Sequence, residues 1–406
     1  MHRAGENAGM DIGIDVSPIQ NGHRFRGIGS YTRGLLYGLG QLETDDRFIL
    51  YYWKGLPLEI ERDNLPRNVT WRGVPFPRVG RVSALLAQQV MMIPSLSMAR
   101  PDLYHQLGIV ADPSAGGLPW AILDRSIVTI HDLTPLVYHD TFLKGKRLRE
   151  QVYRLMLSAA RRARMVLVDS QATQQDVIHL LGVRPERVSI APLAIAPGLM
   201  SALNAPMPSE RPDGLPSSYL LTVAGDYPNK DLATLLTAYA RIASYPSTPD
   251  LVLVGPPGAS VARLRQSNDV AAARIHMYTH LSDAQLAAAY RGAVMVIVPS
   301  VYEGFGLPVL EAMAAGTPVV AANVSSLPEV AGDAALLVPP RDAVALADAI
   351  QELCSCSATR QKLRSRGRER VGLYSWKQTA EATLAAYHRA VLLDPVKHRV
   401  VGRPSV

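Results

Sequence analysis

Short, strongly apolar segments alternate with helical segments along almost the whole chain. In the first half, β-rich runs such as MDIGIDVSP, FILYYW, SIVTIHDL and ARMVLVDS are separated by helical stretches such as YTRGLLYGLGQL. The alternation restarts with YLLTVAG, a helix expected over residues 231–244, and the runs LVLVG, RIHMYT and VMVIVPS. Strands that alternate with helices form parallel sheets covered by helices. The sequence therefore predicts an α/β protein.

The two blocks of alternation indicate two domains, because a chain of 406 residues is too long for one ordinary core. Between the blocks lies PGLMSALNAPMPSERPDGLPS, residues 197–217, which is rich in Pro, Ser and Gly. We interpret it as an interdomain linker without helix or strand. The expected domains are residues 1–200 and 201–375, with a C-terminal helix in residues 376–406 that packs back on the first domain. Ligands would bind in a central cleft, at the carboxyl ends of the strands.

Composition narrows the class of protein. Hydrophobic residues make up 48% of the chain and charged residues 19%, as in soluble globular proteins. No stretch approaches the roughly 18 apolar residues that span a bilayer, and the first ten residues lack the apolar run of a secretory signal. The two cysteines, Cys354 and Cys356, are too close together to close a useful loop and too few for a structural metal site. We expect a cytoplasmic protein.

The net charge of +7 favours an anionic partner. The basic residues concentrate in KGKRLREQVYRLMLSAARRAR, which begins at Lys144, ends at Arg164 and carries eight Lys or Arg against one Glu. Such a helix can lie at the surface of an anionic membrane, and a solvated basic face is the alternative. No recognised nucleic-acid-binding motif accompanies the charge, so we expect no nucleic-acid partner.

The most specific stretch of the sequence is VPSVYEGFGLPVLEAMAAGTPVV. An apolar strand ends, a glycine-rich turn follows, and Pro308 stands where the first turn of a helix tolerates proline. The backbone N–H groups of Gly306 and Leu307 would then lie unpaired at a helix start, which is a ready site for a pyrophosphate. Glu303 lies on the turn and Glu311 in the first turns of the helix, so both carboxylates can face one ligand. The alternative is a loop glutamate and a helix-capping glutamate.

Three other strand ends carry candidate binding residues. The strand YLLTV is followed by a turn, AGDYPNK, that ends at Lys230, where a lysine offers a point charge for phosphate. Gly27 and Gly29 follow the first strand and open a helix, and they allow close approach of backbone to phosphate or form an ordinary tight turn. His131 ends the strand SIVTI, and we expect the next residue, Asp132, to orient it.

The Glu303-x7-Glu311 spacing inside EGFGLPVLEAMAAGTPVV resembles the signature of the GT4 family of retaining glycosyltransferases. This resemblance implies the GT-B fold, in which two Rossmann-like domains face a central cleft. It also implies that Glu303 approaches hydroxyls of the transferred sugar and that Glu311 accepts hydrogen bonds from ribose hydroxyls. Backbone amides of Phe305, Gly306 and Leu307 would bind sugar and phosphate.

The resemblance extends over nearly the whole chain, and it places His131 near the sugar and Gly27 and Gly29 in a glycine-rich loop of the first domain. In the second domain it assigns Lys230 to the leaving diphosphate. The family often has Arg-Lys-Asn at this point, whereas this chain has Asn229, Lys230 and an aspartate. The arginine is absent, and Asn229 is left as a neutral hydrogen-bond donor to the nucleotide sugar.

The resemblance implies transfer of a hexose from a nucleotide diphosphate sugar to a glycan or lipid-linked acceptor, with the anomeric configuration retained. Likeness to mannosyl-transferring members suggests guanosine diphosphate mannose as the donor. No Asp-x-Asp pair is present, so we expect no metal and no other cofactor, and Lys230 with the helix start would stabilise the departing anion. A nucleotide-sugar epimerase and a non-catalytic nucleotide-sugar-binding scaffold remain alternatives. A dinucleotide dehydrogenase is disfavoured because no Gly-x-Gly-x-x-Gly follows a strand with an acid about 20 residues on.

Overall fold

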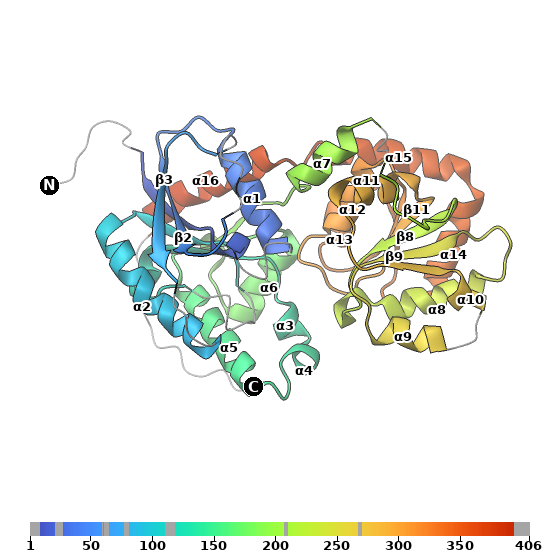
Figure 1. Ribbon diagram of the computed structural model, residues 1–406, viewed down its shortest axis with the longest axis horizontal. Helices are drawn as coiled ribbons and strands as arrows, with labels where there is room; N and C mark the ends of the chain where they lie inside the picture. Colours follow the sequence, from blue (N-terminus) through green and yellow to red (C-terminus); the bar gives the residue numbers. More distant parts are fainter. Residues whose placement is uncertain are drawn as a thin grey trace.

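The computed structural model contains two α/β domains, each built around one parallel sheet (Figure 1). It describes residues 9–20, 27–58, 60, 65–76, 81–109, 118–206, 210–266 and 270–393. Within these residues no helix is long and apolar enough to cross a membrane.

The N-terminal domain has a seven-stranded sheet in the order β3-β2-β1-β4-β5-β6-β7. Its strands are β1 (Asp11–Asp15), β2 (Arg47–Lys54), β3 (Val69–Pro75), β4 (Leu103–Gln106), β5 (Ser126–Ile130), β6 (Met165–Val168) and β7 (Val188–Ile190). Its helices are α1 (Gly27–Leu39), α2 (Arg81–Ala99), α3 (Thr134–Val137), α4 (His139–Phe142), α5 (Arg147–Arg162) and α6 (Gln171–Leu181).

The C-terminal domain has a six-stranded sheet in the order β10-β9-β8-β11-β12-β13. Its strands are β8 (Tyr219–Val223), β9 (Asp250–Val254), β10 (Ile275–Tyr278), β11 (Met295–Val298), β12 (Val319–Ala322) and β13 (Leu336–Val338). Its helices are α8 (Leu232–Ile242), α9 (Ala259–Gln266), α10 (Val270–Ala273), α11 (Asp283–Gly292), α12 (Leu307–Ala314), α13 (Leu327–Ala331), α14 (Ala343–Ser355) and α15 (Ser357–Val371).

The central strands are apolar and buried on both faces, as parallel strands covered by two layers of helices must be. Every residue of β5, β6 and β11 is buried. In each sheet the strand order reverses beside the first strand, between β1 and β4 and between β8 and β11. Ligands of open parallel sheets bind at this reversal, outside the carboxyl ends of the strands.

The expectation that residues 197–217 form a linker without regular structure is wrong for its first part. Residues Pro197–Asn204 form helix α7, which has proline in its first turn and packs against α11. Leu199 and Leu203, one helical turn apart, are buried on its inner face. The prediction failed because the stretch is rich in proline and serine, and two leucines four positions apart are too short a pattern to indicate a helix.

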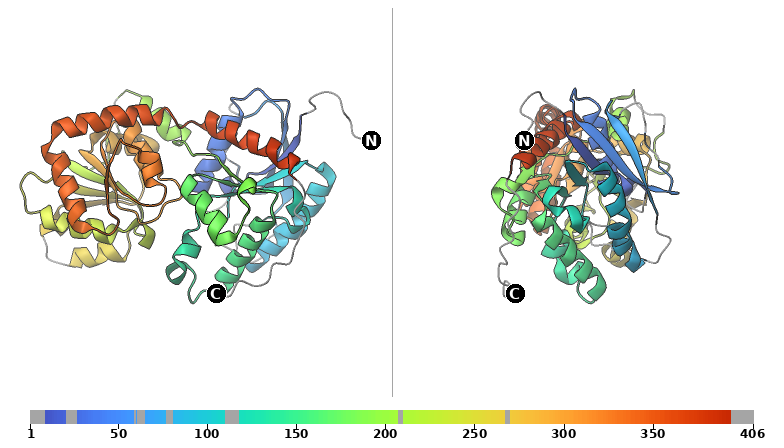
Figure 2. Two further views of the ribbon diagram at one scale, coloured as in Figure 1. Left: turned by 180° about the vertical axis from the view of Figure 1, so that it is seen from behind. Right: turned by 90° about the vertical axis from the view of Figure 1, so that its left-hand side faces the viewer.

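The last helix, α16 (Trp376–Leu392), crosses from the C-terminal domain and lies on the N-terminal domain, in red in Figure 2. It packs against α1, where Gly34 and Gly38 make room for it: a Cβ atom on Gly34 would lie 2.1 Å from the ring of Trp376. The indole N–H of Trp376 donates to the carbonyl of Ile195 at 2.8 Å. Farther along the helix, the Tyr387 hydroxyl contacts Nδ1 of the buried His105 at 2.7 Å. The first domain is therefore completed by helix α16, which follows the second domain in the sequence.

Candidate active site

Lys230 and Glu303 meet in an ion pair at the carboxyl ends of β8 and β11. The Lys230 Nζ atom lies 2.6 Å from Oε1 and 2.7 Å from Oε2 of Glu303. The two side chains are 23% and 11% exposed, so water screens the pair only in part. Because β8 and β11 are adjacent parallel strands, the loops that leave them meet at the same edge of the sheet. The fold thus brings together two residues that the sequence places 73 positions apart.

Asn229, which replaces the expected arginine, is buried. Its side-chain amide donates to the carbonyl of Tyr302 at 3.2 Å, and its own carbonyl accepts from the N–H of Val301 at 2.8 Å. In this structure Asn229 therefore fastens the loop that carries Glu303 to the turn that carries Lys230.

Helix α12 begins at this loop with the geometry of an anion site. Gly306 precedes its first residue with φ of 109°, in the left-handed region that favours glycine. Pro308 stands in the first turn. Within the part of the chain that the structure describes, the backbone N–H groups of Gly306 and Leu307 have no hydrogen-bond acceptor. Phe305, by contrast, turns its ring into the core, 5.5 Å from the ring of Tyr374.

Glu311 lies on α12 with its carboxyl group buried. The Tyr290 hydroxyl of α11 donates to its Oε2 atom at 2.6 Å. Burial raises the pKa of Glu311 to about 7, and the hydrogen bond from Tyr290 opposes this only in part. The carboxyl group therefore changes its protonation state near neutral pH.

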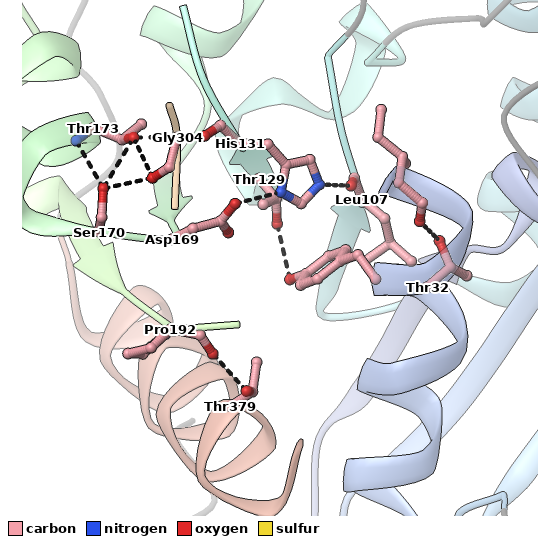
Figure 3. A network of polar contacts seen from close by, with 12 residues as sticks. Thr32, Leu107, Thr129, His131, Asp169, Ser170, Thr173, Pro192, Gly304 and Thr379 are labelled. Atoms are coloured by element: carbon pink, nitrogen blue, oxygen red, sulfur yellow. Dashed lines mark hydrogen bonds and ion pairs between the residues drawn. The ribbon is translucent and has the colours of Figure 1, made fainter. Parts of the chain in front are cut away.

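His131 follows β5 and is held between two acceptors (Figure 3). Its Nδ1 atom lies 2.7 Å from Oδ2 of Asp169, and its Nε2 atom 3.1 Å from the carbonyl of Leu107. Burial lowers the pKa of His131, but the charge and hydrogen bond of Asp169 outweigh it, so the pKa is raised. The expectation that Asp132 orients the histidine is wrong, because Asp132 accepts from the backbone N–H of Thr134 at 2.8 Å.

The loop that carries Glu303 reaches across to the N-terminal domain at Gly304. The hydroxyl groups of Ser170 and Thr173, at the start of α6, donate to the Gly304 carbonyl at 2.7 and 3.1 Å (Figure 3). A Cβ atom on Gly304 would lie 1.9 Å from the carbonyl oxygen of His131. Only glycine allows this approach of the two domains.

Tyr302 makes a second contact between the domains. Its hydroxyl donates to Oδ2 of Asp176 at 2.6 Å and accepts from the backbone N–H of Leu133 at 3.2 Å. Burial and the nearby Asp176 both raise the pKa of Tyr302, so the hydroxyl keeps its proton. Glu329 adds a third contact, because its carboxylate accepts from the N–H of Gln171 at 2.9 Å.

The glycine-rich stretch of the first domain lies only partly within the described residues. Helix α1 begins at Gly27, as the sequence predicts, and a side chain there would meet no atom within 4 Å. Gly29 is buried in the first turn of α1. The preceding Arg26 lies outside the described residues.

Sequence reasoning missed Asp169 and Tyr302 as site residues. Asp169 follows β6, the neighbour of β5, so a comparison of adjacent strand ends could have found it. Tyr302 directly precedes Glu303, but no pattern in the sequence shows what its hydroxyl contacts. Among the described residues, no group of three or more His, Cys, Asp or Glu could hold a metal ion.

Two family models match the chain, one over each domain. The model described as Glycosyltransferase Family 4 matches residues 25–198, and the model described as Glycosyl transferases group 1 matches residues 212–370. The O-antigen chain mannosyltransferase B of Escherichia coli is 30% identical over 407 residues, which cover 93% of this chain and 99% of that protein. The MMP alpha-(1->4)-mannosyltransferase of Mycolicibacterium hassiacum is 33% identical over 57% of this chain, but the match spans only 56% of that relative.

Solved structures confirm the fold. Sucrose-phosphate synthase from Thermosynechococcus elongatus has a TM-score of 0.67 at 22% identity, over 94% of this chain and 99% of that one. WaaG, a glycosyltransferase involved in lipopolysaccharide biosynthesis, has a TM-score of 0.61 at 16% identity, over 92% and 98%. The two facing α/β domains are those of the GT-B fold, and the chain belongs to glycosyltransferase family 4.

Proposed function

We propose that this protein transfers a hexose, with retention of configuration, from a nucleotide diphosphate sugar to an acceptor. The observation that carries the proposal is the Lys230–Glu303 pair beside the start of α12. It places a cation, a carboxylate and unpaired backbone N–H groups at the carboxyl edge of one sheet. The cation and the N–H donors would stabilise the negative charge of the departing diphosphate, and the carboxylate would accept a hydrogen bond from a sugar hydroxyl.

The geometry of the pair suggests how Lys230 serves both groups. An ammonium group has three N–H donors, and the two oxygens of Glu303 take up two of them. The third donor is left for a phosphate oxygen. Lys230 would thus bind the leaving diphosphate while it holds Glu303 in the position that meets the sugar. With both oxygens on Lys230, Glu303 acts as a sugar-binding group, and the phosphate takes the acceptor proton.

Glu311 and His131 would complete the donor site. The proposed role of Glu311 is to accept hydrogen bonds from the ribose hydroxyls, which are stronger when the carboxyl group is ionised. The backbone carbonyl of His131 lies against Gly304, and the proposed role of the His131 ring is to bind the transferred sugar from the side of the N-terminal domain, with a sugar hydroxyl taking the place of the Leu107 carbonyl at Nε2. Gly27 and Gly29 would bring the start of α1 close to the donor. Asn229 would support the loop that carries Glu303 through its hydrogen bonds to Val301 and Tyr302.

We propose guanosine diphosphate mannose as the donor and a glycan or lipid-linked acceptor. The support is that two relatives are named mannosyltransferases, one aligned with 93% of this chain and the other with 57% of it. Similarity to transferases favours transfer over the epimerase alternative. Thermal-shift measurements against GDP-, UDP- and ADP-sugars test the donor, since tight binding to the folded state raises the melting temperature. A shift with UDP-glucose and none with GDP-mannose would refute the choice of donor alone.

Peripheral contact with an anionic membrane is proposed for α5. Its inner face buries Tyr153, Met156 and Leu157, whereas Leu148 and Leu155 are exposed among arginines on the outer face. Two exposed leucines seven positions apart within a basic surface are suited to anionic lipid. The protein should sediment with phosphatidylserine vesicles at low salt and be released at high salt. Equal recovery with phosphatidylcholine vesicles would contradict the proposal.

Kinetics of three variants test the catalytic assignment. Glu303→Gln keeps the volume and removes the charge, and we expect it to lower kcat by about 100-fold. Lys230→Ala should lower kcat and weaken binding of the nucleotide diphosphate product. Glu369→Gln, an exposed change on α15, is the matched control and should leave both unchanged. If Glu303→Gln and Lys230→Ala keep wild-type turnover at an unchanged melting temperature, the assignment of this site is wrong.

A further inference from the structure

A pocket of about 400 Å³ lies on the C-terminal domain at the opposite edge of the sheet from Glu303. Ser218, Pro249 and Val294 line it, and they directly precede β8, β9 and β11. The pocket therefore opens at the amino ends of these strands, whereas Lys230 and Glu303 lie at the carboxyl ends. The remaining lining comes from the loop before Pro249, from the end of α11 and from α14 and α15: Ser247, Arg291, Gly292, Ala293, Cys354, Arg360 and Arg364.

Three arginines and no acidic residue line this pocket. Asp250, which follows the lining residue Pro249, is itself paired with Arg274 at 3.0 Å and His276 at 2.8 Å. The carboxylate of Asp250 is therefore paired with residues that do not line the pocket, and it does not neutralise the three arginines. Uncompensated positive charge in a concave site attracts anions.

Each of the three arginines has N–H donors left for a ligand. Arg360 uses Nη1 to bind the carbonyls at the end of α14, that of Cys354 at 3.0 Å. Arg291 uses Nη2 to bind the carbonyls at the end of α7, that of Ala205 at 2.9 Å. A guanidinium has five N–H donors on three nitrogens, so an arginine that uses one nitrogen to bind carbonyls keeps the N–H donors of the other two nitrogens for a ligand. Arg364, one turn after Arg360, is exposed, and no described carboxylate binds it.

We propose that this pocket binds a small anion through its phosphate or pyrophosphate group, independently of the donor site. Arginine forks match phosphate oxygens in bidentate fashion, and the hydroxyls of Ser218 and Ser247 supply neutral donors. The volume is at the lower end of the range of small-molecule sites. Arg291 joins the pocket to the end of α7, the helix that leads from one domain to the other.

Cys354 provides a local reporter of binding, because it lines the pocket and the chain has one other cysteine. In a Cys356→Ser background, alkylation of the remaining thiol by iodoacetamide reports access to the pocket. Inorganic pyrophosphate at ten times its dissociation constant should slow this reaction by about tenfold, because the bound fraction follows mass action. The same protection should persist in a Lys230→Ala background, which separates the pocket from the donor site.

Arg364→Gln should raise the dissociation constant of pyrophosphate by at least about tenfold, since it removes a charged donor. Lys362→Gln, which removes one charge from an exposed position of the same helix outside the pocket, is the matched control and should not. Arg291→Lys, which keeps the charge but loses the fork, should weaken binding as well. Equal protection in the Arg364 and Lys362 variants, or no protection in the parent, overturns the proposal while leaving the glycosyltransferase assignment intact.

Discussion

Removing the hydroxyl of Tyr302 should separate catalysis from donor binding. In Tyr302→Phe the ring stays, but Asp176 loses a donor at 2.6 Å and the buried N–H of Leu133 loses its acceptor at 3.2 Å. A hydrogen bond to a charged group contributes about 1.5–3 kcal/mol, and an unpaired buried N–H costs about 1–3 kcal/mol. We therefore expect a loss of about 2.5–6 kcal/mol in the contact between the domains.

The loss should appear in kcat. The groups proposed to bind the diphosphate and the ribose, Lys230 and Glu311, both belong to the C-terminal domain, so most of the donor binding energy does not depend on this contact. Catalysis also requires His131 of the N-terminal domain, and the Tyr302 contact keeps that domain in position beside the donor site. If about 2 kcal/mol of the loss reaches the transition state, kcat falls by about 30-fold, while the donor KM stays within about twofold of the parent.

A double-mutant cycle with Asp176→Ala, which removes the acceptor, isolates the contact, measured both by urea unfolding and by kcat. We expect a coupling energy of about 1.5–3 kcal/mol, because the two groups are in direct contact. Tyr138→Phe is the matched control, since its ring packs 6.2 Å from that of Tyr302 without this hydrogen bond. A coupling energy below about 0.5 kcal/mol, or an equal effect of Tyr138→Phe, would refute the reasoning.

Three further outcomes are expected. Because the pKa of Glu311 is raised to about 7, the donor dissociation constant should fall as pH rises from 6 to 8, and isothermal titration of Glu311→Gln should show no such slope. Because the pKa of His131 is raised above 6.5, its charged form stabilises the fold below pH 6.5, and this contribution is lost as pH rises through the folded-state pKa. The difference in free energy of unfolding between the parent and His131→Gln should therefore shrink at higher pH, and a constant difference would contradict the assignment. Gly304→Ala would place a methyl group 1.9 Å from the His131 carbonyl, and steady-state assays should show kcat lowered by about 100-fold or more. Gly145→Ala, which strains an exposed turn at φ of 76° but meets no atom within 4 Å, should leave kcat unchanged.

Local patterns predicted the sheets and the helix that begins after Gly306, because apolar runs alternate with helical ones, proline fixes its own φ angle, and glycine permits the left-handed conformation found at Gly306. The partners of the site residues were harder to predict. Asp132 and Asp169 both follow a strand, and only the packing of β5 beside β6 decides which carboxylate reaches His131. The pairing of Lys230 with Glu303 depends likewise on the adjacency of β8 and β11.

The position of α16 has a consequence for how the chain folds during synthesis. Domains usually fold in the order in which they leave the ribosome. Here the groove on α1 at Gly34 and Gly38 receives Trp376, and the buried His105 receives Tyr387, only after the entire second domain has been translated. Until then the nascent first domain exposes an apolar groove and an imidazole that contacts Thr129 through Nε2 but lacks the partner of its Nδ1 atom, a surface on which a chaperone or another nascent chain can bind. The domain that is synthesised first is the last to be completed.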